Sequence, residues 1–392
     1  MRTIDQFNFK DKKALVRVDF NVPIDNNRVT DNSRIMAAKD TIDKVCNDGG
    51  SCILVSHLGR PQAAEKKYSM LNILCEVEAV FNRKVILSKD IIGHDSTSKA
   101  KNLKSGQILL LENVRFHKEE TEGDIRFAEE LSKLADCFIN DAFGTAHRAH
   151  ASTTLVAQFF KDKFFGKCLE SEVKSIRKVL KNGEKPVLAI LGGAKISTKI
   201  PILKNIIKIA DHIIIGGGMA FTFAKALGGK IGLSIHEDSM LETAKDILDS
   251  SIENNVKIHL PIDVVCSLEF SNSSTRKIFD IMNIDNNFQG MDAGPKSLGL
   301  FKNVVLNAKT ILWNGPLGVF EFSNFSNGTK MLGKFISNST KNGAFSLVGG
   351  GDSVSAVKKL NIESQMSYVS TGGGAMLESL EGKNLPGISA LL

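Results

Sequence analysis

Glycine clusters follow several apolar runs in the second half of this chain. One of them, GGGDS from Gly349 to Ser353, follows the apolar run 345–348 and precedes the helix-like run 354–360. A glycine loop between a strand and a helix presents backbone N–H groups to a phosphate. Asp352 adds a hard oxygen ligand suited to Mg²⁺, and Ser353 adds a hydroxyl. The same pattern is also typical of a tight turn that binds nothing, so the rest of the chain must decide.

Further glycine loops strengthen the phosphate interpretation. Triplets stand at 216–218 and 372–374, and the pair Gly192–Gly193 precedes Lys195 and Lys199. Glycine lets the backbone approach a ligand closely, and the two lysines could neutralise phosphates. The chain lacks GxxxxGK[ST], GxGxxG and GxSxG. It is therefore no P-loop protein, and neither a standard dinucleotide fold nor a hydrolase nucleophile elbow is supported.

The first half instead gathers cationic side chains near the ends of predicted strands. These are Arg34, His57, Arg60, Arg115 and Arg148. A lone arginine is usually a solvated surface residue, but guanidinium groups that converge match phosphate and carboxylate geometry. The first half therefore resembles a receptor for a small, multiply anionic molecule. Asp19 and Asn21, which follow the first strand, would suit a hydroxyl of that molecule.

Alternating apolar runs and helical patterns predict repeated βα units and hence parallel sheets, which bind ligands at the carboxyl ends of their strands. We expect strands at 14–18, 52–55, 85–87, 108–111, 137–139, 187–191, 213–215, 256–260, 309–313, 345–348 and 368–369. We expect helices at 31–47, 70–81, 125–134, 169–180, 200–210, 237–252, 325–336 and 354–360. The predicted fold class is α/β, with two doubly wound, Rossmann-like parallel-sheet domains joined by an inter-domain helix and able to bend at a hinge.

The length of 392 residues favours two or three domains. The run 169–180 has helical spacing, and KNGEKP at 181–186 breaks it before the βα rhythm restarts. We therefore place an N-terminal domain at 1–168, the inter-domain helix and linker at 169–185, a C-terminal domain at 186–380 and a terminal segment at 381–392.

Composition narrows the class of protein. Apolar residues at 42% and charged residues at 24% are typical of a globular protein. The first residues carry no apolar signal segment, and no run approaches the roughly 18 apolar residues of a membrane span. Six scattered cysteines without CxxC spacing indicate buried thiols in a reducing compartment, and hence a cytoplasmic protein. The net charge is +7, but the chain has no basic block with interleaved aromatic residues. An anionic small molecule is therefore favoured over nucleic acid as the partner.

Nine segments of the chain, in order, resemble the signatures of the phosphoglycerate kinase family. They are RVDFNVP (17–23), SHLGRP (56–61), LLLENVRFHKEE (109–120), NDAFGTAHRAH (140–150), LGGAKISTKI (191–200), IIGGGMAFTF (214–223), WNGPLGVFE (313–321), GGGDS (349–353) and EGKNLPGISAL (381–391). The resemblance implies reversible transfer of the acyl phosphate of 1,3-bisphosphoglycerate to MgADP, giving 3-phosphoglycerate and MgATP. It also implies a monomer that binds neither nucleic acid nor membrane.

The resemblance further implies roles for residues of the first half. Asp19 and Asn21 would hold the triose hydroxyl, and Arg34 would grip the reacting carboxyl end and steady the phosphoryl group. The 3-phosphate would lie on a basic patch of His57, Arg60, Arg115 and Arg148. In this interpretation His57 is a cationic phosphate ligand, although a phosphohistidine nucleophile is the alternative. His117, His147 and His150 are interpreted as structural.

In the second half, the resemblance assigns a Mg-nucleotide site. Lys195 would stabilise the transferring phosphoryl group, Lys199 would hold nucleotide phosphates, and Asp352 would bind the Mg²⁺ ion. Gly373 would act at the transfer site, because the loop 372–374 opens a helix aimed there. The other nucleotide-binding residues implied are Gly216, Gly217, Gly290, Met291, Asn314, Pro316, Glu321, Gly350, Gly351 and Ser353, with Glu321 on the ribose. The segment 385–392 would return to the N-terminal domain and help to couple closure.

The chain departs from the family pattern at three positions. Met376 stands where a small serine is usual, and Gln289 and Phe288 replace a more usual Met and Trp beside the adenine. The polar loop 271–277 is expected to be mobile. Two other functions compete: a kinase acting on acetate, carbamate or aspartate, and a non-catalytic binding protein on an inherited fold. The first needs fewer cationic groups than the five found, and the second predicts the loss of Lys195, Arg34 or Asp352.

Overall fold

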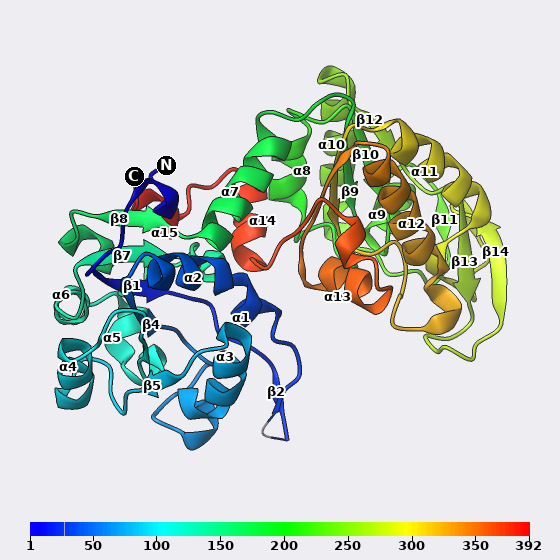
Figure 1. Cartoon of the computed structure of the whole chain (residues 1–392). Coiled ribbons are helices and arrows are strands. Elements are labelled where there is room, and N and C mark those ends of the chain that lie inside the picture. The colour runs from blue at the N-terminus through cyan, green and yellow to red at the C-terminus, as the bar shows by residue number, and fades with distance from the viewer. Residues whose placement is uncertain (27) are drawn as a thin grey trace. The chain divides into compact units, whose positions relative to one another are not determined.

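The chain divides into two compact units in the computed structural model, which describes residues 1–26 and 28–392 (Figure 1). Unit 1 comprises Met1–Lys174 and Asn384–Leu392, and unit 2 comprises Ser175–Lys383. The division falls inside helix α7 (Lys167–Leu180). The chain therefore leaves unit 1 along a helix and re-enters it for its last nine residues, 384–392.

Unit 1 contains a sheet of six strands that all run parallel. In spatial order they are β5 (Val85–Leu87), β6 (Ile108–Leu110), β4 (Ser51–Val55), β1 (Lys13–Arg17), β7 (Cys137–Asn140) and β8 (Lys163–Phe165). The helices of this unit are α1 (Ser33–Ala37), α2 (Lys39–Asn47), α3 (Leu74–Phe81), α4 (His94–Lys101), α5 (Lys118–Glu122), α6 (Ile125–Ser132) and α15 (Pro386–Ser389). A short antiparallel pair, β2 (Ile24–Asp25) and β3 (Arg28–Val29), follows β1. Every residue of β4, β6 and β7 is buried, as expected for parallel strands covered on both faces.

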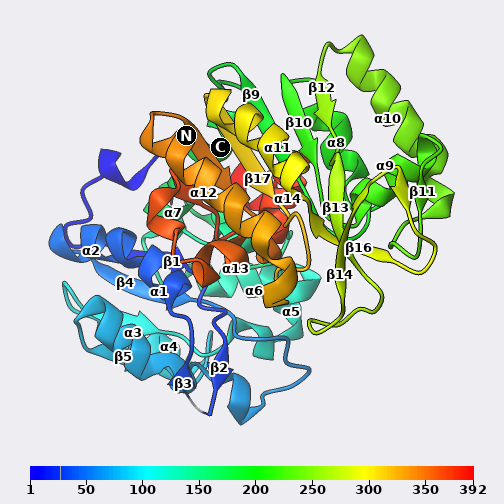
Figure 2. The ribbon, with the colours of Figure 1, turned by 90° about the vertical axis from the view of Figure 1, so that its right-hand side faces the viewer.

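Unit 2 is built on a second parallel sheet of six strands. Their spatial order is β12 (Lys257–His259), β10 (His212–Ile215), β9 (Val187–Leu191), β17 (Thr310–Asn314), β18 (Phe345–Val348) and β19 (Tyr368–Val369). Counted along the chain, these strands have the order 3-2-1-4-5-6 of a doubly wound sheet. Figure 2 labels β12, β10, β9 and β17 of this sheet. Such a sheet binds ligands where the strand order reverses, which here is between β9 and β17.

The helices of unit 2 include several that follow the glycine loops. They are α8 (Ile200–Ile206), α9 (Met219–Ala226), α10 (Leu241–Glu253), α11 (Pro295–Asn307), α12 (Asn327–Lys341), α13 (Gly351–Lys359) and α14 (Gly374–Leu380). Trp313 and Phe301 are fully buried in the core of this unit. The two parallel sheets confirm the predicted fold class.

An antiparallel sheet in unit 2 was not expected from the sequence. It joins β14 (Arg276–Asp280), β13 (Asp263–Ser267) and β16 (Gln289–Ala293), and a further pair joins β11 (Lys230–Ile231) to β15 (Asn283–Ile284). Part of the loop 271–277, expected to be mobile, thus belongs to β14. Strand β14 is mostly exposed and begins with Arg276 and Lys277, so it lacks the apolar alternation that predicts a strand.

Several of the expected helices differ in their bounds, and two of them show how. The helix predicted at 31–47 is divided at Ala38, whose N–H bonds to the carbonyls of Ile35 and Met36 in a tighter turn. Buried positions Ile35, Ala38 and Ile42 continue across the break, which explains why the pattern indicates one helix. The helix predicted at 70–81 begins as a 3₁₀ turn over Met70–Ile73 before α3.

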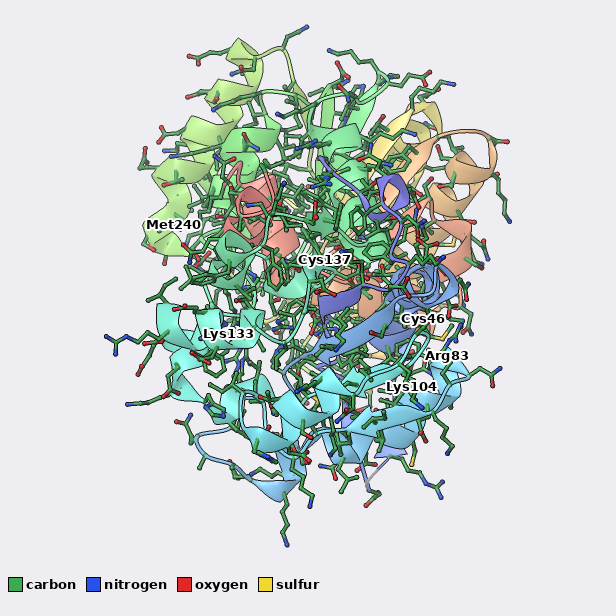
Figure 3. All side chains as sticks on the ribbon, turned by 60° about the vertical axis from the view of Figure 1, so that its left-hand side comes forward. Cys46, Arg83, Lys104, Lys133, Cys137 and Met240 are labelled. Carbon is green, nitrogen blue, oxygen red and sulfur yellow. The ribbon has the colours of Figure 1, made fainter. Side chains whose placement is uncertain are left out.

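All six cysteines are free thiols, and four of them are buried. Figure 3 labels two of the buried ones, Cys46 on α2 and Cys137 at the start of β7. Cys75 is exposed, so the expectation of buried thiols is wrong at this position. No helix in the described parts of the chain, 1–26 and 28–392, is long and apolar enough to span a membrane.

Candidate active site

Arg34 of unit 1 is held beside the loop that follows β1. Its Nη1 atom donates hydrogen bonds to Oδ2 of Asp19 at 3.0 Å and to the carbonyl of Asn21 at 3.2 Å. The side chain of Asn21 accepts a bond from the N–H of Gly59 at 2.8 Å, which ties this loop to the one after β4. About a third of the Arg34 side chain, 34%, remains exposed and can reach a ligand. The structure thus brings Asp19, Asn21 and Arg34 together.

Three arginines of the predicted phosphate patch line one groove of unit 1. The groove has a volume of about 690 Å³, and Arg60, Arg115 and Arg148 share it with Lys118 and His117. Arg115 is fixed by a 2.7 Å hydrogen bond from its Nη1 to the carbonyl of Gly59. Burial, followed by the charges of Arg148 and Arg17, lowers the pKa of Arg115 to about 10, so the group stays cationic at neutral pH. Cationic side chains that line one groove favour an anionic ligand.

Arg17, for which the sequence indicates no role, is a fully buried member of this arginine cluster. Its Nε atom donates to the hydroxyl of Ser152 at 2.8 Å, and its Nη2 atom lies 3.4 Å from Nδ1 of His57. Glu120, also fully buried, accepts bonds from the N–H of Ser152 at 2.8 Å and from its hydroxyl at 2.7 Å. An arginine inside the apolar run 14–18 was the available signal, since a buried charge needs a partner.

The expectation that His57 is cationic is wrong. Burial, followed by the charges of Arg17 and Arg115, holds the pKa of His57 well below its usual value. The imidazole is therefore neutral at pH 7, and because Arg17 can only donate, Nδ1 accepts and the proton lies on Nε2. A neutral N–H donor can still bind a phosphate oxygen, so the assignment of His57 to the substrate stays a prediction.

The two histidines that flank Arg148 have contacts with the protein itself. Nε2 of His147 accepts a 3.2 Å bond from Nε of Arg148. Nδ1 of His150 lies 3.7 Å from Oε1 of Glu120, and burial with the neighbouring arginines lowers the pKa of His150 to about 4. Both contacts fit a supporting role around the arginine cluster.

Unit 2 has a cavity of about 330 Å³ where the loops after β9, β17 and β18 meet. This is the point at which the strand order reverses. Its lining includes Lys195 and Lys199 together with Asn314, and with Gly192, Gly193, Gly315, Gly350, Gly351, Asp352 and Ser353. Lys195 is exposed, whereas burial lowers the pKa of Lys199 and the charge of Asp352 opposes that shift. Nζ of Lys199 donates to Oδ1 of Asn314, whose Nδ2 donates to the carbonyl of Gly349 at 2.7 Å.

The GGGDS segment forms the first turn of α13. Gly350 precedes the helix with φ of +91°, a conformation that favours glycine. The hydroxyl of Ser353 is buried and accepts a 2.5 Å bond from the N–H of Gly315, so it joins the loops after β17 and β18 at the lining of the cavity. The backbone N–H groups of the first turn remain suited to phosphate oxygens.

Asp352 lies on this first turn and is exposed. Among the residues that the structure describes, no three His, Cys, Asp or Glu side chains are grouped so that they could hold a metal. Asp352 would therefore be one oxygen ligand among several, and the others would have to come from the nucleotide and water. That arrangement is usual for Mg²⁺ bound with phosphates.

A second, largely apolar cavity of about 390 Å³ adjoins the first. Gly193, Ala194 and Asp352 line both cavities. The lining of the second also includes Gly217, Gly218, Phe221, Ile235, Pro261, Val264, Phe270, Gln289, Gly290, Met291, Pro316, Leu317, Val319 and Glu321. Of the predicted nucleotide residues, Gly217, Gly290, Met291, Pro316 and Glu321 thus share one slot. Gly216 and Gly373 are not among the described residues that line either cavity.

The departures from the family pattern have distinct places. Met376 is fully buried and packs against Gly349, where an added Cβ would lie 1.6 Å from its sulfur. Its side chain is therefore buried against the loop between β18 and α13. Gln289 lines the apolar cavity, and the ring of Phe288 packs against Phe279 at 4.9 Å.

The fold and the cavities are those of a two-unit α/β phosphotransferase, with adjoining glycine-lined and apolar cavities in one unit and an arginine-lined groove in the other. The family model described as phosphoglycerate kinase matches residues 4–383. The chain belongs to the phosphoglycerate kinase family.

Individual relatives agree with this assignment. The phosphoglycerate kinase of Porphyromonas gingivalis is 48% identical over an alignment of 416 positions, which covers 99% of each chain. That of Chloroherpeton thalassium is 44% identical over 391 residues, covering 100% of this chain and 98% of the relative. The solved phosphoglycerate kinase of Coxiella burnetii has a TM-score of 0.91 at 39% identity and covers 99% of this chain and 98% of its own. The predicted family and the predicted kinase activity, phosphoryl transfer to ADP in glycolysis, are confirmed.

Proposed function

We propose that the two units divide the reaction between them. Unit 1 holds 3-phosphoglycerate or 1,3-bisphosphoglycerate, and unit 2 holds ADP or ATP with its Mg²⁺ ion. The acyl phosphate passes directly between the substrates, in line, after the units close. The observation that carries this proposal is the pair of adjoining cavities in unit 2, one apolar and one rich in lysine and glycine, with Asp352 in the lining of both.

On unit 1, the contacts of each side chain suggest its task. Arg60, Arg115 and Arg148 would bind the 3-phosphate, because they line one groove and have few anionic partners there. His57 would add a neutral Nε2–H donor. Asp19 and Asn21 would hold the triose hydroxyl, while Arg34, already fixed by both, would face the reacting carboxyl end.

On unit 2, the base would occupy the apolar slot and the phosphates the glycine loops. Lys199 would release its hydrogen bond to Asn314 and bind the phosphates instead. Glu321 would bind the ribose, and Asp352 would provide an oxygen ligand to the Mg²⁺ ion, which supplies charge neutralisation when bound. Gly373 would contribute through the loop that opens α14.

The chemistry requires charge stabilisation more than proton transfer. In either direction the nucleophile is an ionised oxygen, of a carboxylate or a phosphate, so no general base is needed. Lys195 and Arg34 would offset the charge that develops on the transferring phosphoryl oxygens. Closure would exclude water that could otherwise accept the phosphoryl group. A monomeric state and a cytoplasmic location complete the proposal.

A coupled assay tests the proposal directly. We expect ADP release with 3-phosphoglycerate and MgATP, and none when the nucleotide is omitted. Acetate in place of 3-phosphoglycerate serves as the matched control and should give no turnover, because it has no phosphate for the arginine groove. Equal turnover with acetate would overturn the assignment of that groove.

A further inference from the structure

We propose that Glu237 positions Lys195 by clamping the loop between β9 and α8. The inference rests on the proposed role of Lys195 in stabilising the transferring phosphoryl group. Neither the family signatures nor the cavities point to Glu237, which lines neither cavity as far as the described residues go. It is a positioning residue in this proposal, because it acts on the substrate only through Lys195.

The loop that carries Lys195 needs external support. Residues 192–199 form neither a helix nor a strand, and Lys195 itself is exposed. At the start of the loop, the carbonyl of Gly193 accepts a 3.0 Å bond from the N–H of Met219, the first residue of α9. A long lysine on an irregular loop loses much conformational freedom when it is aimed at one point, so the loop must be fixed elsewhere too.

Glu237 supplies that second fixed point. Its Oε2 atom accepts a bond from the N–H of Ser197 at 3.0 Å, and its Oε1 atom accepts one from the hydroxyl of Ser197 at 2.7 Å. Both carboxylate oxygens thus bind one residue of the loop, two positions beyond Lys195. Burial works against ionisation, but the bonds from Ser197 and then the charge of Lys195 outweigh it and lower the pKa of Glu237. The carboxylate is therefore charged at neutral pH, where its hydrogen bonds are strong.

These bonds do not serve the turn to which Glu237 belongs. Glu237 precedes the 3₁₀ turn Asp238–Met240, whose last residue is labelled in Figure 3, and its side chain makes no capping bond to that turn. Its backbone N–H instead donates to the hydroxyl of buried Thr222 on α9 at 3.2 Å. Through Gly193 and through Ser197, the Lys195 loop is therefore tied to α9 on both sides of the lysine.

The test uses single and combined variants of the full chain. Glu237→Gln keeps the size of the side chain but removes its charge and one of its two acceptors. We expect kcat to fall on the order of tenfold, as for loss of a charge-assisted bond that holds a catalytic group, with the Kd for MgADP changed less than about twofold. Ser197→Ala should have a similar effect, and the two effects should not multiply in the double variant. Glu242→Gln is the matched control, since Glu242 is 83% exposed and pairs with Lys245.

Epistasis with Lys195 separates positioning from a structural role. In a Lys195→Ala background, Glu237→Gln should leave kcat unchanged, because there is no lysine left to position. If the substitution lowers kcat by the same factor in both backgrounds, Glu237 supports the fold and the inference is overturned. Circular dichroism melting checks each variant, and rates are expressed per folded molecule.

The outcome also distinguishes the inference from the proposed function. If Lys195→Ala alone keeps the full rate, the proposed role of Lys195 fails and the inference falls with it. If Lys195→Ala lowers the rate but Glu237→Gln leaves it intact, only the role of Glu237 is rejected.

Discussion

We assign Arg34 of unit 1 to the reacting carboxyl end of the triose, with its guanidinium group held by Asp19 and by the carbonyl of Asn21. We predict that Arg34→Ala lowers kcat by about 10²–10³, the usual loss for one charge-stabilising donor. The KM for MgATP should change little, because the predicted nucleotide ligands lie in unit 2. Steady-state kinetics with both substrates measure kcat and the KM for MgATP separately. Arg126→Ala on the exposed face of α6 is the control. A loss of ATP affinity as large as the loss of kcat would contradict the assignment.

Asp352 carries the predicted contact with the metal. Asp352→Ala should reduce kcat/KM for MgADP on the order of 100-fold, since a carboxylate ligand to the Mg²⁺ ion is removed. Raising the free Mg²⁺ concentration should not restore the rate, because the missing group belongs to the protein. Asp249→Ala on helix α10 is a suitable control. Full activity of Asp352→Ala would take this residue out of the metal site.

His57 should bind substrate without a charge of its own. Because its pKa is held well below the usual value of about 6.5, its ring should stay neutral through the range from pH 8 to pH 6. The unfolded chain would bind this proton more readily, so the stability that neutral His57 contributes should be lost as the pH falls below about 6.5. Ring ¹H–¹³C resonances, assigned with the variant His57→Gln, test this. A titration midpoint near 6.5 would restore the cationic interpretation.

At the scale of elements, β16 packs on α9 beside the apolar cavity in which we propose that the nucleotide base binds. An ideal Cβ on Gly290 would lie 2.0 Å from Cζ of Phe221, so Gly290→Ala should push this ring into the cavity. We predict that the KM for MgADP rises about tenfold, because the slot loses room for the base. Phe221→Leu should recover part of the affinity in the double variant.

The control for this prediction is Gly299→Ala on helix α11. An added Cβ there meets nothing within 4 Å, so the variant should keep its nucleotide affinity. It should also stabilise the helix by about 0.5–1 kcal/mol. An unchanged KM in Gly290→Ala would show that the slot is not where the base binds.

The sequence predicted strands best where a short apolar run ends at glycine or serine. The strands expected at 85–87 and 368–369 match β5 and β19 in both bounds. The strands expected at 187–191 and 345–348 match β9 and β18 in both bounds, and the loops after them line the phosphate cavity. Prediction from the sequence failed where tertiary contacts determine the secondary structure. Exposed β14 carries no apolar alternation, and Ala38 interrupts a helix whose buried positions continue across it.

The chemical state of side chains was harder to predict than their position. Sequence placed His57 beside arginines, but only the buried Arg17, at 3.4 Å from its ring, shows why it is neutral. Likewise, the sequence gives no sign that the hydroxyl of Ser353 accepts a bond from the N–H of Gly315, 38 positions earlier in the chain. Charge and hydrogen-bond partners depend on burial and on residues far apart in the chain, which local spacing does not encode.

At the scale of the whole molecule, the predicted catalytic groups lie in different units. Arg34 belongs to unit 1 and Lys195 to unit 2, yet both are assigned to one phosphoryl group. Reactants must come within about 3–3.5 Å and water must be excluded, so we predict that the units close on both substrates. If the bound nucleotide alone closed the units, it could be hydrolysed without transfer to the triose. We therefore expect closure to require both substrates.

Small-angle X-ray scattering tests this requirement. We predict that the radius of gyration falls when 3-phosphoglycerate and a non-hydrolysable MgATP analogue are added together, and that either ligand alone has a smaller effect. Arg34→Ala should weaken the response to the pair while leaving the binding of the nucleotide analogue intact, because Arg34 would link the triose to the transferring group. The full decrease with one ligand alone would reject the requirement for both. An unchanged radius with both ligands would reject hinge closure, and the reaction would then need another way to bring Arg34 and Lys195 to the same phosphate.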